Sequence, residues 1–378
     1  MNPLIHHLKI TNFKSIDTLT LNDVQSFSVF AGANGCGKSN FFDALEFISV
    51  FVKVGVTNAL RKYGGYKHIY SQKRRKDAIG QFDFEIDVSL SEDDKLVRFK
   101  YNLSISKLDT TPEITEKLHI NGDLVMEREE GKFPKLIAYN GEEKVIEHYP
   151  NEFSALLCFP DLSLALLLRN IRLYRIDPIS SKEPDSSEQD PTVLSIKGDN
   201  LASVLARLEQ EGELQGIILE WMETIVPSIE KINTEQQKLD GKTAIFFKEI
   251  GTRRQFPAHM ISDGTIYALC LLVAILDAPK YGLTLIEEPE RGLHPKAINE
   301  LVGFIREQSC FSSPLWMTTH SESVVRALQL SELWVVDKNQ GKTRMKSAKK
   351  QGLRDEDFAP LGLDKAWLSN FLDGGLPW

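Results

Sequence analysis

The sequence Gly-Ala-Asn-Gly-Cys-Gly-Lys-Ser at residues 32–39 decides the fold class. It matches the pattern G-x-x-x-x-G-K-[ST], in which the backbone N–H groups of a glycine-rich loop surround phosphate groups at a helix N-terminus. An apolar segment at residues 26–31 predicts a strand before the loop, and apolar residues at helical spacing over residues 40–52 predict a helix after it. Strand, phosphate-binding loop and helix are therefore expected in immediate succession.

Two side chains of this loop have expected roles. Lys38 would place its ammonium group on the β and γ phosphates of a nucleotide, and Ser39 would offer its hydroxyl to Mg²⁺. A glycine-rich turn without a ligand is the alternative interpretation, but it leaves the flanking strand and helix unexplained. The loop therefore predicts ATP and Mg²⁺ as cofactors.

The chain after residue 262 alternates between helical and short apolar segments. Helices are expected at residues 266–276, 295–308 and 321–328, and strands at residues 283–286, 315–318 and 333–337. This alternation predicts a parallel sheet covered by helices. The strand at residues 283–286 ends in Glu287 and Glu288, where one carboxylate would hold the Mg²⁺ shell and the other would orient an attacking water.

The middle of the chain has a different pattern. Residues 80–148 contain several stretches in which apolar and polar side chains alternate. The turn signals Asn121-Gly122 and Asn140-Gly141 interrupt these stretches, which predicts an antiparallel sheet. Beyond it we expect a helical segment at 151–172, a mobile loop at 177–191, a helical segment at 201–224 and a hairpin at 229–250. No heptad pattern reaches three repeats, so a long coiled coil is not expected.

Composition narrows the function classes. The 378 residues carry a net charge of −8, and their four cysteines form no C-x-x-C pair. Without a run of about 18 apolar residues or an apolar leader, we expect a cytoplasmic protein with no membrane contact. DNA or RNA could be contacted only through local basic stretches, at residues 73–76 and 342–350, and solvated loops explain such runs more often than nucleic-acid binding does.

Three groups of residues resemble the ATPases of the RecF and SMC families. They are Asn12 to Ser15 with Asn34 to Leu45, then Glu287 to Glu290 with Gly292 to Pro295, and finally Thr318 to Ser321. The resemblance extends to the AAA_21-like stand-alone ATPases of bacterial anti-phage defence systems and to the ATPase half of overcoming-lysogenization-defect proteins. It implies an α/β fold: an ABC/RecF-type P-loop ATPase domain with an antiparallel β subdomain and a helical insert.

The resemblance also implies roles for individual positions. Nucleotide contacts are expected from Lys14, Gly32, Asn34, Gly35, Cys36, Gly37, Lys38, Ser39 and Asn40. Ser262 and Gly264 match a degenerate signature that contacts the nucleotide of the opposite subunit, and His294 lies in a D-loop at the dimer interface. Metal contacts are expected from Ser39 and Glu287, and catalysis from Glu288 and the switch histidine His320.

Two features depart from the family pattern. Glu287 replaces the aspartate that is usual at the first acidic position, although it still supplies an oxygen ligand for Mg²⁺. The glutamine of the Q-loop is not assigned, because Gln72 and Gln81 are both candidates and neither lies in a motif. One Mg²⁺ contact therefore stays open.

We expect four parts: an N-terminal ATPase lobe (1–150), a helical insert (151–230), a C-terminal ATPase lobe (231–345) and a tail (346–378). The tail is apolar, and it either packs on the core or docks a partner. The function expected by family analogy is a homodimer that sandwiches ATP and regulates a separate effector protein in anti-phage defence. The alternatives are a RecF-like DNA repair ATPase and a non-hydrolysing scaffold stabilised by ATP.

Overall fold

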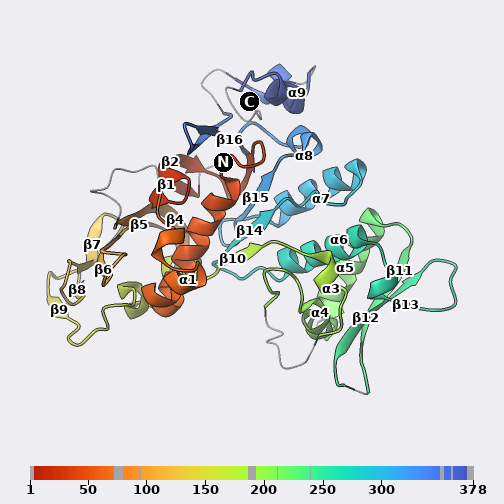
Figure 1. Ribbon diagram of the computed structural model, residues 1–378, viewed down its shortest axis with the longest axis horizontal. Helices are drawn as coiled ribbons and strands as arrows, with labels where there is room; N and C mark the ends of the chain where they lie inside the picture. Colours follow the sequence, from red (N-terminus) through yellow and green to blue (C-terminus); the bar gives the residue numbers. More distant parts are fainter. Residues whose placement is uncertain are drawn as a thin grey trace.

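The computed structural model describes residues 4–71, 80–92, 95–185, 193–210, 212–238, 240–349, 353–358 and 361–372. These residues form three sheets and the helices around them (Figure 1). The basic stretch at residues 73–76 lies outside this described part, as do Gln72 and the last six residues. Within the described ranges, no helix combines the length and the hydrophobicity needed to cross a bilayer.

A six-stranded sheet forms the centre of the molecule. Its strands run in the order β10 (Ile171–Tyr174), β14 (Leu283–Glu287), β15 (Leu315–Thr319), β3 (Phe27–Ala31), β16 (Leu333–Asn339) and β17 (Lys342–Ser347). The first five strands are parallel and β17 is antiparallel to β16. Because parallel strands end at the same edge, segments far apart in the sequence meet at the carboxyl end of this sheet.

Side chains of the central sheet alternate between two hydrophobic cores. Phe30, Trp316 and Trp334 face the core that contains helix α1 (Lys38–Lys62), where Phe30 lies 4.9 Å from the ring of Phe41. Val29, Met317 and Val335 point to the opposite core. This period of two explains why the strands read as continuous apolar runs, since both faces are covered.

The core on the α1 side is completed by an eight-stranded antiparallel sheet, on the left of Figure 1. Its order is β2 (Ile16–Val24), β1 (Ile5–Phe13), β4 (Phe82–Glu92), β5 (Lys95–Ser106), β6 (Glu113–Ile120), β7 (Asp123–Arg128), β8 (Lys135–Ile137) and β9 (Glu143–Val145). Helix α2 (Ser163–Arg169) and the 3-10 helices η1 (Tyr66–His68) and η3 (Ala155–Cys158) contribute side chains to the same core. The predicted antiparallel sheet over residues 80–148 is confirmed.

The opposite core is built by helices and by a small sheet, on the right and at the top of Figure 1. The helices are α3 (Pro178–Ser181), α4 (Leu201–Glu209), α5 (Gly212–Ile225), α6 (Asp263–Leu276), α7 (Pro295–Gln308), α8 (Glu322–Arg326) and α9 (Leu363–Leu368), with the 3-10 helices η4 (Ala258–Met260) and η5 (Asp355–Phe358). The sheet contains β11 (Ile229–Gln236), β12 (Thr243–Glu249) and β13 (Phe256–Pro257). In the tail, Trp367 and Leu372 are buried, whereas Phe371 is exposed.

The expected fold class is confirmed: the structure is an α/β fold with an antiparallel β subdomain and a helical insert, and its described residues contain no long coiled coil.

Two local predictions are wrong. The segment at 151–172 is not helical to its end, because residues 171–174 form the edge strand β10. Part of the expected loop at 177–191 is helix α3, which Asp177 caps by accepting a hydrogen bond from the Ile179 backbone N–H. Strands β2 and β17 were not expected.

Candidate functional site

Three neighbouring parallel strands end beside one another and carry the expected site residues. Strand β3 runs into the glycine-rich loop, β14 ends in the two acidic residues, and β15 is followed by His320. The register pairs Glu287 with Thr318 and Thr319 with Ala31. The backbone N–H of Gly32 also donates to the carbonyl of Thr319. The structure therefore brings the N-terminal and C-terminal motifs to one edge.

The loop has the backbone conformation that its glycines predict. Gly35 and Gly37 have φ angles of 77° and 106°, in the left-handed region that glycine adopts without strain. Lys38 is buried, and its Nζ donates to the carbonyl oxygens of Gly32 at 2.7 Å and Ala33 at 3.0 Å. Helix α1 starts here with no side-chain cap and no acidic residue in its first turn. Its first N–H groups and Lys38 therefore fit an anionic phosphate.

Ser39 and Glu287 lie together beside this helix start. The Ser39 hydroxyl donates to Glu287 Oε2 at 3.1 Å, although 248 positions separate the two residues. A hydroxyl and a carboxylate are hard oxygen ligands, and Mg²⁺ commonly takes one or two protein oxygens together with substrate phosphates and waters. The pair therefore fits a Mg²⁺ ion bound with a nucleotide.

Glu288 has an unusual backbone conformation. Its φ angle is 51°, which is rare for a residue with a side chain and indicates local strain. The buried hydroxyl of Tyr267 in α6 donates to the carbonyl of Glu288 at 2.8 Å. The Glu288 carboxylate lies 3.1 Å from His320 Nδ1. The Glu288 carboxylate thus lies against His320, the expected switch histidine.

A second carboxylate, Glu290, supports this histidine from the buried side. Glu290 Oε1 accepts a hydrogen bond from the Thr319 hydroxyl at 2.7 Å and one from the His320 backbone N–H at 3.3 Å. Burial raises the pKa of Glu290, and these hydrogen bonds oppose the shift. The Glu290 contacts hold the backbone at the end of β15, from which His320 projects.

The signature-like segment lies at the start of α6. Ser262 is exposed and caps this helix by accepting from the Thr265 N–H. A side chain at Gly264 would collide with the carbonyl oxygen of Gly292. The helix start therefore packs directly on the D-loop-like segment, residues 292–294. His294 caps α7 by accepting from the Lys296 N–H. Ser262 and Gly264 therefore form one surface with the D-loop-like segment.

Residues near the C-terminus support the glycine-rich loop, and the sequence pattern did not predict them. Thr343 in β17 donates to the carbonyl of Cys36 at 3.0 Å and lies 2.7 Å from the Ser15 hydroxyl. Asn40 donates to the same Ser15 hydroxyl at 2.6 Å. Lys338 donates to the carbonyl of Gly35 at 3.2 Å. The β16–β17 hairpin is therefore part of the site.

Other expected residues have the following surroundings. Asn34 is exposed at the tip of the loop. Lys14 forms an ion pair with Asp43 of α1. Gln81 donates to Asp83 and Ser104 in the antiparallel sheet, so it does not point to the acidic pair. Arg175, which directly follows the neighbouring strand β10, contacts Glu287 instead, and it lies in no recognised motif.

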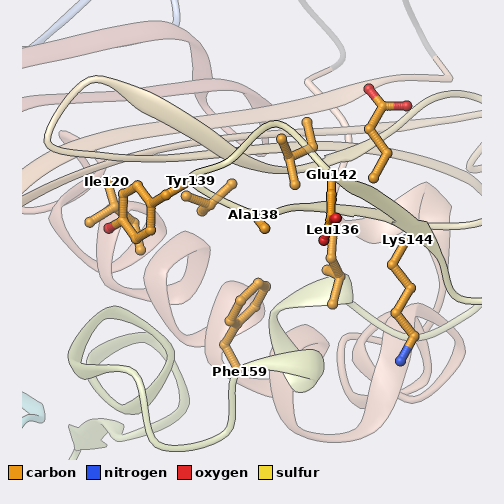
Figure 2. A pocket seen from close by; sticks show the side chains of 10 residues that line it. Ile120, Leu136, Ala138, Tyr139, Glu142, Lys144 and Phe159 are labelled. Atoms are coloured by element: carbon orange, nitrogen blue, oxygen red, sulfur yellow. The ribbon is translucent and has the colours of Figure 1, made fainter.

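A cavity of about 700 Å³ lies at the far end of the eight-stranded sheet. In Figure 2, Phe159 faces Leu136 and Ala138 across this cavity. The lining is mostly apolar, and Tyr139 on its rim is largely exposed. None of the expected site residues lines it, so we do not include it in the candidate site.

Replacing Thr343 by valine is expected to weaken ATP binding about fivefold. Valine keeps the shape but leaves the buried Cys36 carbonyl without its donor, which costs about 1–3 kcal/mol and loosens the loop. Titration with a fluorescent ATP analogue measures the effect. Thr343→Ser keeps the hydroxyl and should bind like the wild type; equal affinity of the valine variant would show that the hairpin does not support the loop.

Comparisons with known proteins agree with this geometry. The family model described as "AAA domain, putative AbiEii toxin, Type IV TA system" matches residues 27–136 and 161–326. No match to a curated protein was found.

Solved structures of SMC heads are similar in fold. One is the crystal structure of an SMC head bound to the C-winged helix domain of ScpA, with 15% identity and a TM-score of 0.59 over 94% of this chain and 99% of that chain. Another is a Pyrococcus furiosus SMC head with an extended coiled coil, bound to the C-terminal domain of ScpA. It has 14% identity and a TM-score of 0.55 over 95% of this chain and 98% of that chain. The fold is therefore that of SMC head domains, and since the family model matches more than half of its residues, the chain belongs to the AAA-domain family described as putative AbiEii toxin, Type IV TA system.

Proposed function

We propose that this protein hydrolyses ATP in a Mg²⁺-dependent reaction at the carboxyl edge of the central sheet. The observation that carries the proposal is the position of Glu288. Its carboxylate lies against His320, next to the strand end where Glu287 meets the Ser39 hydroxyl. A phosphate loop, a metal-binding pair and a carboxylate beside them are the parts that phosphoryl transfer to water requires.

Each residue has a separate task in this mechanism. Lys38 and the first N–H groups of α1 hold the phosphates, and Lys38 exchanges the carbonyls of Gly32 and Ala33 for phosphate oxygens. Ser39 and Glu287 would hold the Mg²⁺ ion, which neutralises charge on the phosphates when it is bound.

Glu288 orients the attacking water and accepts its proton, while the bond between the γ phosphorus and the ADP oxygen breaks. His320 fixes the Glu288 carboxylate through the 3.1 Å contact. Tyr267 and Glu290 hold the backbones that carry these two side chains. Positioning and charge stabilisation thus supply the catalysis, and no covalent intermediate is required.

We further propose that two copies of the chain sandwich two ATP molecules. The start of α6 supports this arrangement: Ser262 is exposed there, and the helix start packs directly on Gly292 of the D-loop-like segment. Gly264, Gly292 and His294 belong to the same surface. ATP would then act as the link between two chains.

The dimer would regulate a separate effector protein, and bacterial anti-phage defence is the setting that family analogy favours. The two similar SMC heads were each solved with a domain of ScpA, so heads of this fold do bind other proteins. A nucleic-acid role is the second candidate. The exposed side chains of Lys338, Arg344 and Lys349 near the β16–β17 hairpin favour it.

Glu288→Gln is expected to lower ATP turnover by at least about 100-fold while ATP binding is kept, because an amide cannot accept the proton of the water. Phosphate release and nucleotide binding are measured on the same preparation. Glu300→Gln, an exposed change on α7, is the matched control and should keep wild-type turnover. Turnover of Glu288→Gln within a few-fold of the wild type would show that another group activates water.

The sandwich is tested by light scattering on Glu288→Gln, which should retain bound ATP. With ATP and Mg²⁺ the mass is expected to rise to twice the 42.8 kDa of one chain. Adding Ser262→Arg should block this rise by placing a bulky side chain where the second nucleotide would meet α6. A mass that does not respond to ATP, or an unaffected arginine variant, would contradict the arrangement.

A further inference from the structure

Arg175 occupies a position for which the expected function gives no role. It follows β10 directly, and β10 pairs with β14 so that Tyr174 lies opposite Ile286. Continuing this parallel register by one residue places Arg175 next to Glu287. The edge of the central sheet therefore presents a cation at the carboxylate that is the candidate Mg²⁺ ligand.

The guanidinium group joins two carboxylates. One nitrogen, NH2, donates to Glu287 Oε1 at 2.8 Å and to Asp43 Oδ1 at 2.5 Å. Lys14 contacts the other oxygen of Asp43, and Ser39 contacts the other oxygen of Glu287. The five side chains thus form a continuous chain of ion pairs and hydrogen bonds from the end of β1 to the start of α1.

The charge on Arg175 is fixed. Burial opposes the charged form, but the hydrogen bonds and charges of Glu287 and Asp43 outweigh it and raise the pKa of Arg175. A divalent cation held by Ser39 and Glu287 would share the same carboxylate with the guanidinium. Two cations a few ångströms apart repel each other, so Glu287 cannot serve both equally well.

We propose that Arg175 senses the terminal phosphate: it neutralises Glu287 until ATP and Mg²⁺ bind, and then exchanges this carboxylate for the γ phosphate. The inference rests on the proposed function, because it concerns the same nucleotide site. A phosphate is the natural acceptor for a guanidinium displaced by a metal ion, since arginine forms strong bidentate hydrogen bonds with phosphate oxygens. With ADP no γ phosphate is present, so Arg175 stays on Glu287 and competes with the metal.

The segment after Arg175 leads to the signature-like surface. The backbone N–H of Arg175 donates to the carbonyl of Ile196, and Asp177 caps α3 two residues later. Lys182, just after α3, forms an ion pair with Asp263, the first residue of α6. A displacement of Arg175 would therefore move the segment that leads to Lys182, seven residues later, and Lys182 contacts the residue next to Ser262. The nucleotide state of one site could in this way bias the surface that meets the second copy.

The inference is tested by comparing the affinities of ATP and ADP in Mg²⁺, measured by fluorescence competition rather than by turnover. In the wild type, ATP should bind more tightly than ADP. In Arg175→Gln this preference is expected to fall about tenfold, because ATP loses a charged partner and ADP with Mg²⁺ gains an uncontested carboxylate. Arg175→Lys keeps the charge but cannot bridge two carboxylates as arginine does, so it should lose about threefold.

Arg172→Gln is the matched control, since Arg172 lies in β10, the strand directly before Arg175 in the chain, and donates to the Asp277 carbonyl instead of to Glu287. It should keep the wild-type preference. If Arg175→Gln did not fold, as judged by circular dichroism, the preference of Arg175→Lys for ATP over ADP would test the inference instead.

A preference that stays within twofold in the folded Arg175 variants would overturn the inference alone. The hydrolysis proposal would still stand if Glu288→Gln removed turnover. Failure of the wild type to bind ATP would overturn both proposals.

Discussion

The parallel pairing of β14, β15 and β3 is the constraint on which the rest of the structure depends. It places the ends of three strands at one edge, so that Ser39 and Glu287 come within hydrogen-bonding distance although they are 248 positions apart in the sequence. The pairing holds only because both faces of the sheet are buried. Helix α1 covers one face and α6 lies in the core on the other, so apolar side chains on both faces of the sheet are buried.

The charged side chains of the site at this edge are paired with other groups of the protein. Lys38 is bound by two carbonyls of its own loop, and the two carboxylates Asp43 and Glu287 share Arg175. Leaving the buried charges of Lys38 and Asp43 unpaired would be costly, and each has partners within the protein. On the proposed role of Arg175, binding of ATP with Mg²⁺ would rearrange these contacts and communicate the nucleotide state to α6.

The sequence predicted the parts of the site that lie in contiguous motifs. The glycine-rich loop, the acidic pair and His320 could be placed together because each follows an apolar strand, and the strands of an alternating α/β segment are parallel. Arg175 could not be predicted, since its strand β10 has only four residues at the end of an apolar segment, where periodicity does not separate strand from helix. Thr343 and Tyr267 are single hydroxyl groups that tertiary packing alone brings to the loop and to Glu288.

The central claim is that this edge of the sheet binds ATP with Mg²⁺. Isothermal titration calorimetry of ATP with Mg²⁺ into the wild type and Lys38→Ala tests it most directly. The account predicts saturable binding at one site per chain in the wild type and none in Lys38→Ala. Binding that survives the loss of Lys38 would place the nucleotide elsewhere, and a wild type that shows no binding would contradict the account as a whole.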